Sequence, residues 1–141
     1  RPFAPAVLEE RAEELFEIKG SSPYMTVTFV VQSNWVEKLQ AVVHVDGTAR
    51  VQTVNSEIHP LFYNLIAAFD RLTGVPAVLN TSFNARGEPI VETPLDALAT
   101  FSSAGMDALF LGSYLITKPR ATRKDKKADY FCQTVDGEVV K

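Results

Sequence analysis

The sequence predicts a mixed α/β (α+β) fold, and three observations support that prediction. Hydrophobic residues make up 46% of the 141 positions, which is ample for a core. Residues 58–72 repeat apolar side chains at the spacing of a helix, and residues 75–80 form a short apolar run typical of a buried strand. A chain of this length is most simply a single domain.

The first predicted element is a helix over residues 6–16, because Pro5 suits a first helical turn and acidic residues follow early. A strand is expected over residues 24–31, which are rich in β-branched and aromatic side chains. Residues 41–45 are expected to form a second strand, and residues 50–54 its returning partner. The pair Asp46-Gly47 between them is a common hairpin signal.

The second half begins with the predicted helix over residues 58–72, which Gly74 is expected to end. The buried strand over residues 75–80 follows. Thr93 and Pro94 then open another helix, since threonine caps helices well and proline fits the first position.

That helix is expected to run to about Gly105, and residues 108–111 and 114–117 are expected to be strands. We place the domain at residues 1–118. Basic residues gather after that point, so residues 119–141 are expected to be a flexible basic tail, to which residues 130–131 and 139–140 add a small strand.

Composition excludes several classes of function. The net charge of −3 gives no general attraction to nucleic acid or to an anionic membrane. One cysteine, Cys132, is compatible with a reducing cytoplasm, and two histidines far from it give no zinc-ligand pattern. No apolar run reaches the roughly 20 residues that span a bilayer. Because the chain begins at Arg1 rather than methionine, we expect it to be part of a longer protein.

The main candidate site is the polar run that follows the strand over residues 75–80. Asn80, Ser82 and Asn84 alternate, so an extended backbone would point all three the same way, toward phosphate or carbonyl oxygens. The other interpretation is a polar turn in which these side chains bond their own backbone. Spacing alone favours neither.

Fixed positive charge is available from Arg1, Arg50 and Arg86, whose guanidinium groups suit phosphate oxygens. Arg50 is equally compatible with a solvent-facing place on a hairpin, and Arg86 with a loop anchor. His44 lies in an apolar stretch, where a structural histidine is more common than a catalytic one. The sequence holds no glycine-rich phosphate motif of a known type.

Three segments of the chain resemble the C-terminal domain of the O-carbamoyltransferases, the enzymes of nodulation-factor, cephamycin and tobramycin carbamoylation. They are Arg-Pro-Phe-Ala-Pro at residues 1–5, His-Val-Asp-Gly-Thr-Ala-Arg-Val-Gln at 44–52, and Leu-Asn-Thr-Ser-Phe-Asn with Arg-Gly-Glu-Pro-Ile-Val at 79–84 and 86–91. Residues 107–109 and 115–118 also fit, so the resemblance covers about residues 1–118.

The resemblance implies a YrdC-like twisted mixed sheet flanked by helices, incomplete at its N-terminus. It implies a domain that binds carbamoyl phosphate and ATP, with Mg²⁺ accompanying the nucleotide, and that makes carbamoyl-adenylate. The ligand-binding residues would be Arg1, Arg50, Asn80 and Ser82, with Asn84 completing a Ser-x-Asn element and Arg50 and Ser82 as catalytic groups.

The partner that the resemblance implies is an N-terminal Kae1-like transfer domain of the same protein, which passes the carbamoyl group to a small-molecule acceptor hydroxyl. In the family, the segment before Arg-Pro-Phe-Ala-Pro carries further basic ligand-binding residues. We therefore expect that this chain alone does not complete the reaction.

Two other classes of function stay open. A nucleic-acid-binding module would use the basic tail, although the acidic balance of the chain argues against a nucleic-acid partner. A non-catalytic interaction domain would dock through an exposed apolar patch near Phe3 and Leu8.

Overall fold

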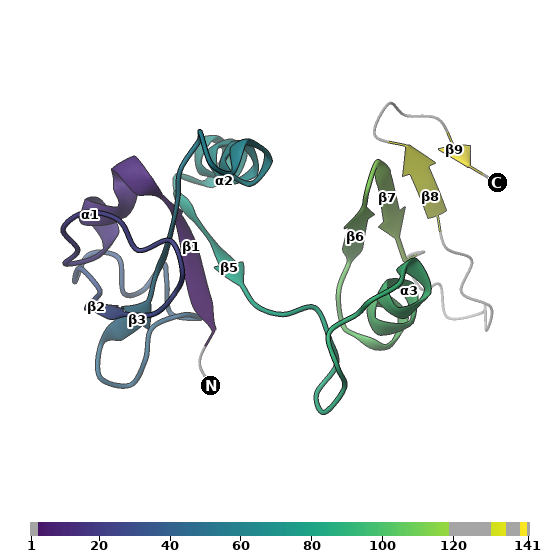
Figure 1. The fold of residues 1–141 in the computed structure, drawn as a ribbon, viewed down its shortest axis with the longest axis horizontal. Coiled ribbons are helices and arrows are strands. Elements are labelled where there is room, and N and C mark those ends of the chain that lie inside the picture. Colours follow the sequence, from purple (N-terminus) through teal and green to yellow (C-terminus); the bar gives the residue numbers. More distant parts are fainter. Residues whose placement is uncertain (1–2, 119–130, 135–138, 141) are drawn as a thin grey trace. The chain divides into compact units, whose positions relative to one another are not determined.

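The computed structural model of this chain describes residues 3–118, 131–134 and 139–140. Two compact units make up the chain, Arg1–Thr81 and Ser82–Lys141. Both contain helix and strand (Figure 1), so the predicted mixed α/β content is confirmed.

The main sheet of the first unit has three strands in the order β4-β1-β5. The central strand β1 (Ala4–Leu8) runs parallel to β4 (Gln52–Val54) and antiparallel to β5 (Ala77–Asn80). The sheet is therefore mixed, as the family resemblance implied. β5 confirms a strand within residues 75–80, but of its four residues only Ala77 is buried.

Strand β1 corrects the helix predicted over residues 6–16. Only the end of that segment is helical, as the 3₁₀ turn η1 (Glu9–Arg11) and the single turn α1 (Ala12–Leu15). All five residues of β1 are buried, and a short apolar run has no periodicity that distinguishes a buried strand from a buried helix. Pro5 is tolerated because the pairing of β1 with β4 begins one residue later, at Ala6.

A second, two-stranded sheet pairs β2 (Thr28–Val30) with β3 (Thr48–Arg50). The strand predicted over residues 24–31 is thus shorter than expected. The strand predicted over residues 41–45 is wrong: these residues form turns and irregular backbone, because β2 supplies the partner of β3.

The turn expected at Asp46-Gly47 does form. Gly47 has a φ of +80°, which glycine adopts without strain, and its N–H donates to the His44 carbonyl at 3.0 Å. The strand predicted over residues 50–54 is divided at Val51, where the chain passes from β3 to β4 and so from one sheet to the other.

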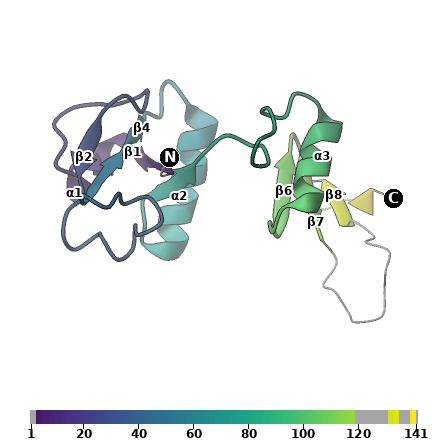
Figure 2. The ribbon, with the colours of Figure 1, turned by 90° about the horizontal axis from the view of Figure 1, so that it is seen from below.

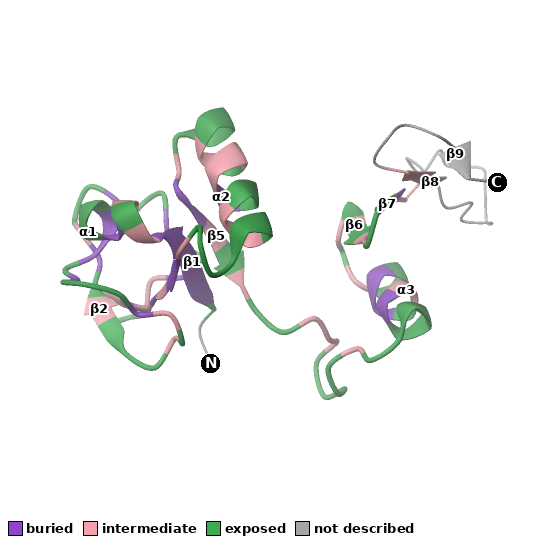
Figure 3. Ribbon diagram, turned by 45° about the horizontal axis from the view of Figure 1, so that its top comes forward, coloured by how far each residue is buried: buried purple, intermediate pink, exposed green. Residues whose placement is uncertain are grey.

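Helix α2 (Pro60–Thr73) confirms the helical stripe, and Gly74 ends it in the left-handed conformation, with φ +71°. Ile66 is fully buried and packs in one cluster with Ala6, Leu8 and Val54 of the main sheet. Figures 1 and 2 show α2 alongside β1 and β5. Figure 3 shows that α2 is partly exposed, and the large hydrophobic side chains of the helix that are exposed are Leu61, Leu65, Phe69 and Leu72.

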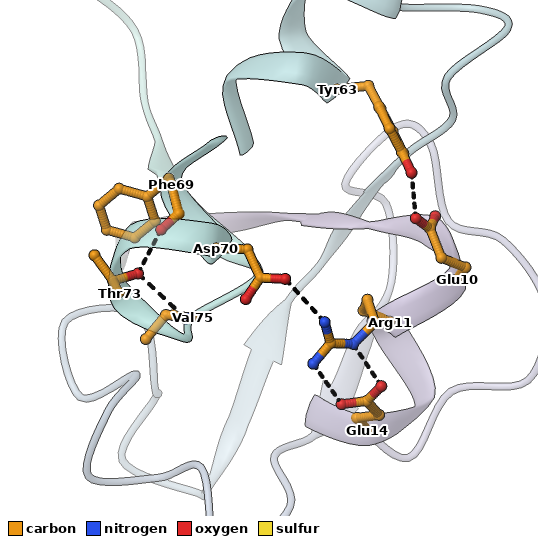
Figure 4. A network of polar contacts seen from close by, with 8 residues as sticks. All are labelled: Glu10, Arg11, Glu14, Tyr63, Phe69, Asp70, Thr73 and Val75. Atoms are coloured by element: carbon orange, nitrogen blue, oxygen red, sulfur yellow. Dashed lines mark hydrogen bonds and ion pairs between the residues drawn. The ribbon is translucent and has the colours of Figure 1, made fainter. Parts of the chain in front are cut away.

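The opposite face of the main sheet carries the larger core cluster, which includes Val7, Leu15, Phe16 and Val51. The N-terminal segment is tied to α2 by polar contacts at its surface (Figure 4). Arg11 reaches Asp70 of α2 at 2.8 Å and also pairs with Glu14.

In the second unit, α3 (Pro94–Ser103) begins as predicted. Thr93 and Asp96 form a reciprocal capping box, in which the Thr93 hydroxyl accepts from the Asp96 N–H and the Asp96 carboxylate accepts from the Thr93 N–H. Phe101 is fully buried.

The strands β6 (Ala108–Leu111) and β7 (Tyr114–Thr117) also confirm the prediction, and β8 (Phe131–Thr134) and β9 (Val139–Val140) extend their sheet in the order β6-β7-β8-β9. The remainder of the expected basic tail, residues 119–130, 135–138 and 141, lies outside the described residues. The domain boundary expected at residue 118 stays a prediction.

Helices long and apolar enough to cross a membrane are not found in the described part of the chain.

Candidate functional site

The amide side chains of Gln52 and Asn80 meet across the central strand of the main sheet. Asn80, the last residue of β5, donates from Nδ2 to Oε1 of Gln52 on β4 at 2.6 Å. Their register partners on β1 are Ala4 and Ala6, both fully buried. Paired residues share one face of a sheet, so the two amides meet above the smallest side chains of β1.

The Gln52 amide is anchored at its other end as well. Gln52 donates from Nε2 to the Pro23 carbonyl at 3.2 Å. A peptide carbonyl only accepts, so this contact fixes which end of the Gln52 amide faces Asn80. Gln52 and Asn80 therefore form an ordered polar pair.

Arg50 lies two residues before Gln52, at the end of β3, with buried Val51 between them. Alternation along an extended chain places Arg50 and Gln52 on the side away from Val51. Arg50 is half-buried, and no described carboxylate pairs with it. Its guanidinium is thus a positive charge that is available to an anion.

His44 belongs to a hydrogen-bonded chain in the turn before β3. The Thr48 hydroxyl donates to the Asp46 carboxylate at 2.7 Å and lies 3.1 Å from His44 Nδ1. Since its proton points to Asp46, the hydroxyl accepts from Nδ1–H. The other ring nitrogen, His44 Nε2, is buried with no partner among the described residues.

The same hydroxyl, together with the Thr48 N–H at 3.0 Å, holds the pKa of Asp46 below its ordinary value. The turn therefore keeps a negative charge that orients Thr48 and, through it, His44. His44 Nδ1 has a hydrogen-bond partner within the turn, which suits the structural role that the sequence favoured. His44 Nε2 has no partner among the described residues.

Ser82 and Asn84 belong to the second unit and lie in a loop. β5 ends at Asn80, so the extended row expected through Asn80, Ser82 and Asn84 does not form. Instead Ser82 Oγ donates to Asn84 Oδ1 at 2.5 Å, and Asn84 Nδ2 donates to the Glu88 carbonyl at 2.9 Å. Asn84 thus bonds its own loop, in line with the polar-turn interpretation.

Arg86 lies at the exposed tip of this loop. The Glu88 N–H donates to the Ala85 carbonyl at 3.1 Å, and Gly87 has a φ of +85°. These features define a tight turn that glycine permits. Arg86 has no ion-pair partner among the described residues.

The candidate residues are therefore distributed as follows. The first unit holds Arg50, His44 and Asn80, the second holds Ser82, Asn84 and Arg86, and Arg1 lies outside the described residues. Sequence reasoning missed Gln52. Its alternation with Arg50 was a usable signal, but its bond to Asn80 depends on strand order.

The first unit thus carries an ordered amide pair and, two residues before Gln52, an arginine without a described carboxylate partner. Comparison with known families then identifies the class of protein. Residues 1–118 match the family described as Carbamoyltransferase C-terminus, and the chain belongs to that family.

Known relatives include Nodulation protein NolNO of Sinorhizobium fredii, 48% identical over 128 residues, which are 89% of this chain and 19% of the relative. Nodulation protein NolO of Bradyrhizobium diazoefficiens is 42% identical over 131 residues, 91% of this chain and 24% of the relative. Nodulation protein U of Rhizobium tropici is 34% identical over 120 residues, 85% and 20% respectively. The matched part of the chain spans only 19–24% of the length of these relatives.

Proposed function

We propose that this chain is the carbamoyl-phosphate- and ATP-binding part of an O-carbamoyltransferase, and that it forms carbamoyl-adenylate. Membership of the carbamoyltransferase C-terminal family supports the transferase role. The observation that carries the ligand assignment is Arg50, which has no ion-pair partner among the described residues and lies two residues before Gln52 in the chain.

The chemistry requires positioning and charge neutralisation rather than a protein nucleophile. Water cleaves carbamoyl phosphate to carbamate and phosphate. A carbamate oxygen then attacks the α-phosphorus of ATP, and the bond to pyrophosphate breaks. Fixed cations and hydrogen-bonding groups accelerate such a step by holding the reactants in line and stabilising the phosphoryl oxygens. Arg50 would bind phosphoryl oxygens in this scheme.

Mg²⁺ would arrive on the phosphates of ATP. In the described ranges, no group of three His, Cys, Asp or Glu side chains lies close enough to hold a metal ion. Mg²⁺ commonly keeps several waters and binds substrate phosphates instead of a closed protein cage. The nucleotide is accordingly its main ligand in this proposal.

The partner in this scheme is an N-terminal transfer domain of the same protein, which hands the carbamoyl group to an acceptor hydroxyl. The much greater length of the relatives leaves room for such a domain. We place the reaction in the cytoplasm, where ATP is available and the lone Cys132 would stay reduced.

The test is a titration of the ¹⁵N-labelled chain with carbamoyl phosphate and with ATP·Mg²⁺, followed by NMR. We expect saturable shifts at Arg50, Gln52 and Asn80. The matched reference residue is Arg71, an exposed arginine on α2. Equal shifts at Arg71 and Arg50 would mean only general ion binding, and no shifts with either ligand would overturn the proposal.

A further inference from the structure

The Gln52–Asn80 pair determines which atom of Asn80 faces a ligand. The Pro23 carbonyl takes the Gln52 Nε2 donor, so Gln52 Oε1 faces Asn80. Asn80 must then turn its own Nδ2 donor toward that oxygen, at 2.6 Å. The Pro23 carbonyl therefore fixes the orientation of the Gln52 amide, and the Gln52 amide fixes that of Asn80.

The bond to Gln52 uses one of the two Nδ2 protons of Asn80 and leaves its oxygen, an acceptor, without a partner among the described residues. No donor of the described residues bonds Asn80 Oδ1, and the side chain is only half-buried. A carbonyl oxygen accepts hydrogen bonds and cannot donate them. Asn80 Oδ1 therefore disfavours phosphate oxygens and favours an N–H group.

We infer that Asn80 Oδ1 accepts a hydrogen bond from an N–H group of the ligand. Gln52 is then a positioning residue, because it fixes the orientation of the Asn80 amide. The inference rests on the proposed function. It divides the site chemically, because Arg50 takes phosphate oxygens while Asn80 takes an amino group. Two groups in that scheme supply such a donor: the NH₂ of the carbamoyl moiety and the 6-amino group of adenine.

Two ligand pairs distinguish these sources. Acetyl phosphate replaces the NH₂ of carbamoyl phosphate by a methyl group and keeps the phosphate. Inosine triphosphate has a carbonyl oxygen where ATP has its amino group. For the pair that Asn80 reads, we expect the amino ligand to bind roughly three- to tenfold more tightly, the ratio that one hydrogen bond supports.

Three variants test whether Gln52 fixes the orientation of the Asn80 amide. Gln52→Leu should lower the ratio, because Asn80 is then free to rotate and its oxygen is no longer held toward the ligand. Gln52→Glu should keep the ratio, since its carboxylate still accepts from Asn80 and its charge acts equally on both ligands of a pair. Asn80→Asp should also keep the ratio, because it retains an acceptor, and Asn64→Asp on the exposed side of α2 is its matched control.

The outcomes separate this inference from the proposed function. Equal affinity within both pairs for the unmodified chain would overturn the inference and leave the proposed function standing. A loss of all binding in Asn80→Asp beyond that in Asn64→Asp would show that Asn80 donates to phosphate, and would also overturn it. Failure of every ligand to bind the unmodified chain would overturn the proposed function, and the inference with it.

Discussion

Asn80 and Gln52 lie on strands that are not neighbours, yet their side chains are hydrogen-bonded at 2.6 Å. Strand β1 separates them, and it carries Ala4 and Ala6 where they meet. A large side chain at either alanine would occupy the space that the two amides share. The small residues of β1 therefore belong to the same arrangement as the polar pair.

Arg50→Ala should weaken binding of carbamoyl phosphate or ATP by about 1.5–3 kcal/mol, the scale of a hydrogen bond to a charged group. The guanidinium has no described carboxylate partner, so its removal leaves no buried charge behind. Isothermal titration calorimetry would measure the change. Arg71→Ala is the control, and equal losses in the two variants would contradict the role of Arg50.

Ile66→Ala should destabilise the first unit by about 2–5 kcal/mol, because Ile66 is fully buried between α2 and the main sheet. Leu61→Ala on the same helix should change the free energy of unfolding by less than about 0.5 kcal/mol, since Leu61 is 88% exposed. Denaturant unfolding followed by circular dichroism would compare them. Similar losses would mean that the outer side of α2 is covered in solution.

Thr48→Val should raise the pKa of Asp46 toward its ordinary value of 3.8, because the Thr48 hydroxyl is the main cause of its depression. A depressed carboxyl pKa stabilises the folded turn above the unfolded pKa, and that contribution is lost as pH falls through the folded value. NMR titration of the Asp46 carboxyl carbon would give its titration midpoint in the unmodified chain and in the variant. An unchanged midpoint would show that the hydroxyl does not bond Asp46.

Thr93→Ala should destabilise α3 by about 1 kcal/mol, because it removes the side chain that caps the helix. A second bond, in which the Thr93 hydroxyl donates to the Asp96 carboxylate, is the largest cause that lowers the pKa of Asp96. The cap is therefore complete above pH 3.8, and acid weakens it as Asp96 is protonated through its lower folded pKa. Thr93→Ser should retain both effects, and hydrogen exchange at the first turn of α3 would report them.

Arg11→Met should destabilise the first unit by about 1 kcal/mol, since Arg11 joins the N-terminal segment to α2 through Asp70. Because Arg11 is about one-third exposed, salt should reduce the difference between the variant and the unmodified chain. Lys19→Met, at an exposed position, is the control. Thermal unfolding at low and high salt would test it, and a difference that salt leaves unchanged would argue for packing rather than charge.

Local signals in the sequence predicted much of the secondary structure correctly. The apolar period of α2, the capping pair of α3 and the glycine that ends α2 each act within a few residues of the chain. The turn at Asp46-Gly47 was predictable for the same reason. The hairpin expected around this turn does not form, however, because β3 pairs with β2.

Elements whose structure depends on distant partners were predicted less well. Residues 4–8 are apolar throughout, and only their position between β4 and β5 makes them a strand. Residues 41–45 have strand-like composition, but β3 pairs with β2 instead. Strand propensity reflects packing against neighbours, and the sequence does not state which neighbours those are.

The candidate site shows the same difference between features that are local in the sequence and features that depend on distant strands. The sequence by itself determined the residue types, an arginine and asparagines in family motifs, because side-chain chemistry is written directly in the residues. Only the tertiary structure decided that Gln52 orients Asn80 and that Asn84 bonds its own loop. The direction of a hydrogen bond depends on which strands lie side by side, and strand order is a property of the folded chain.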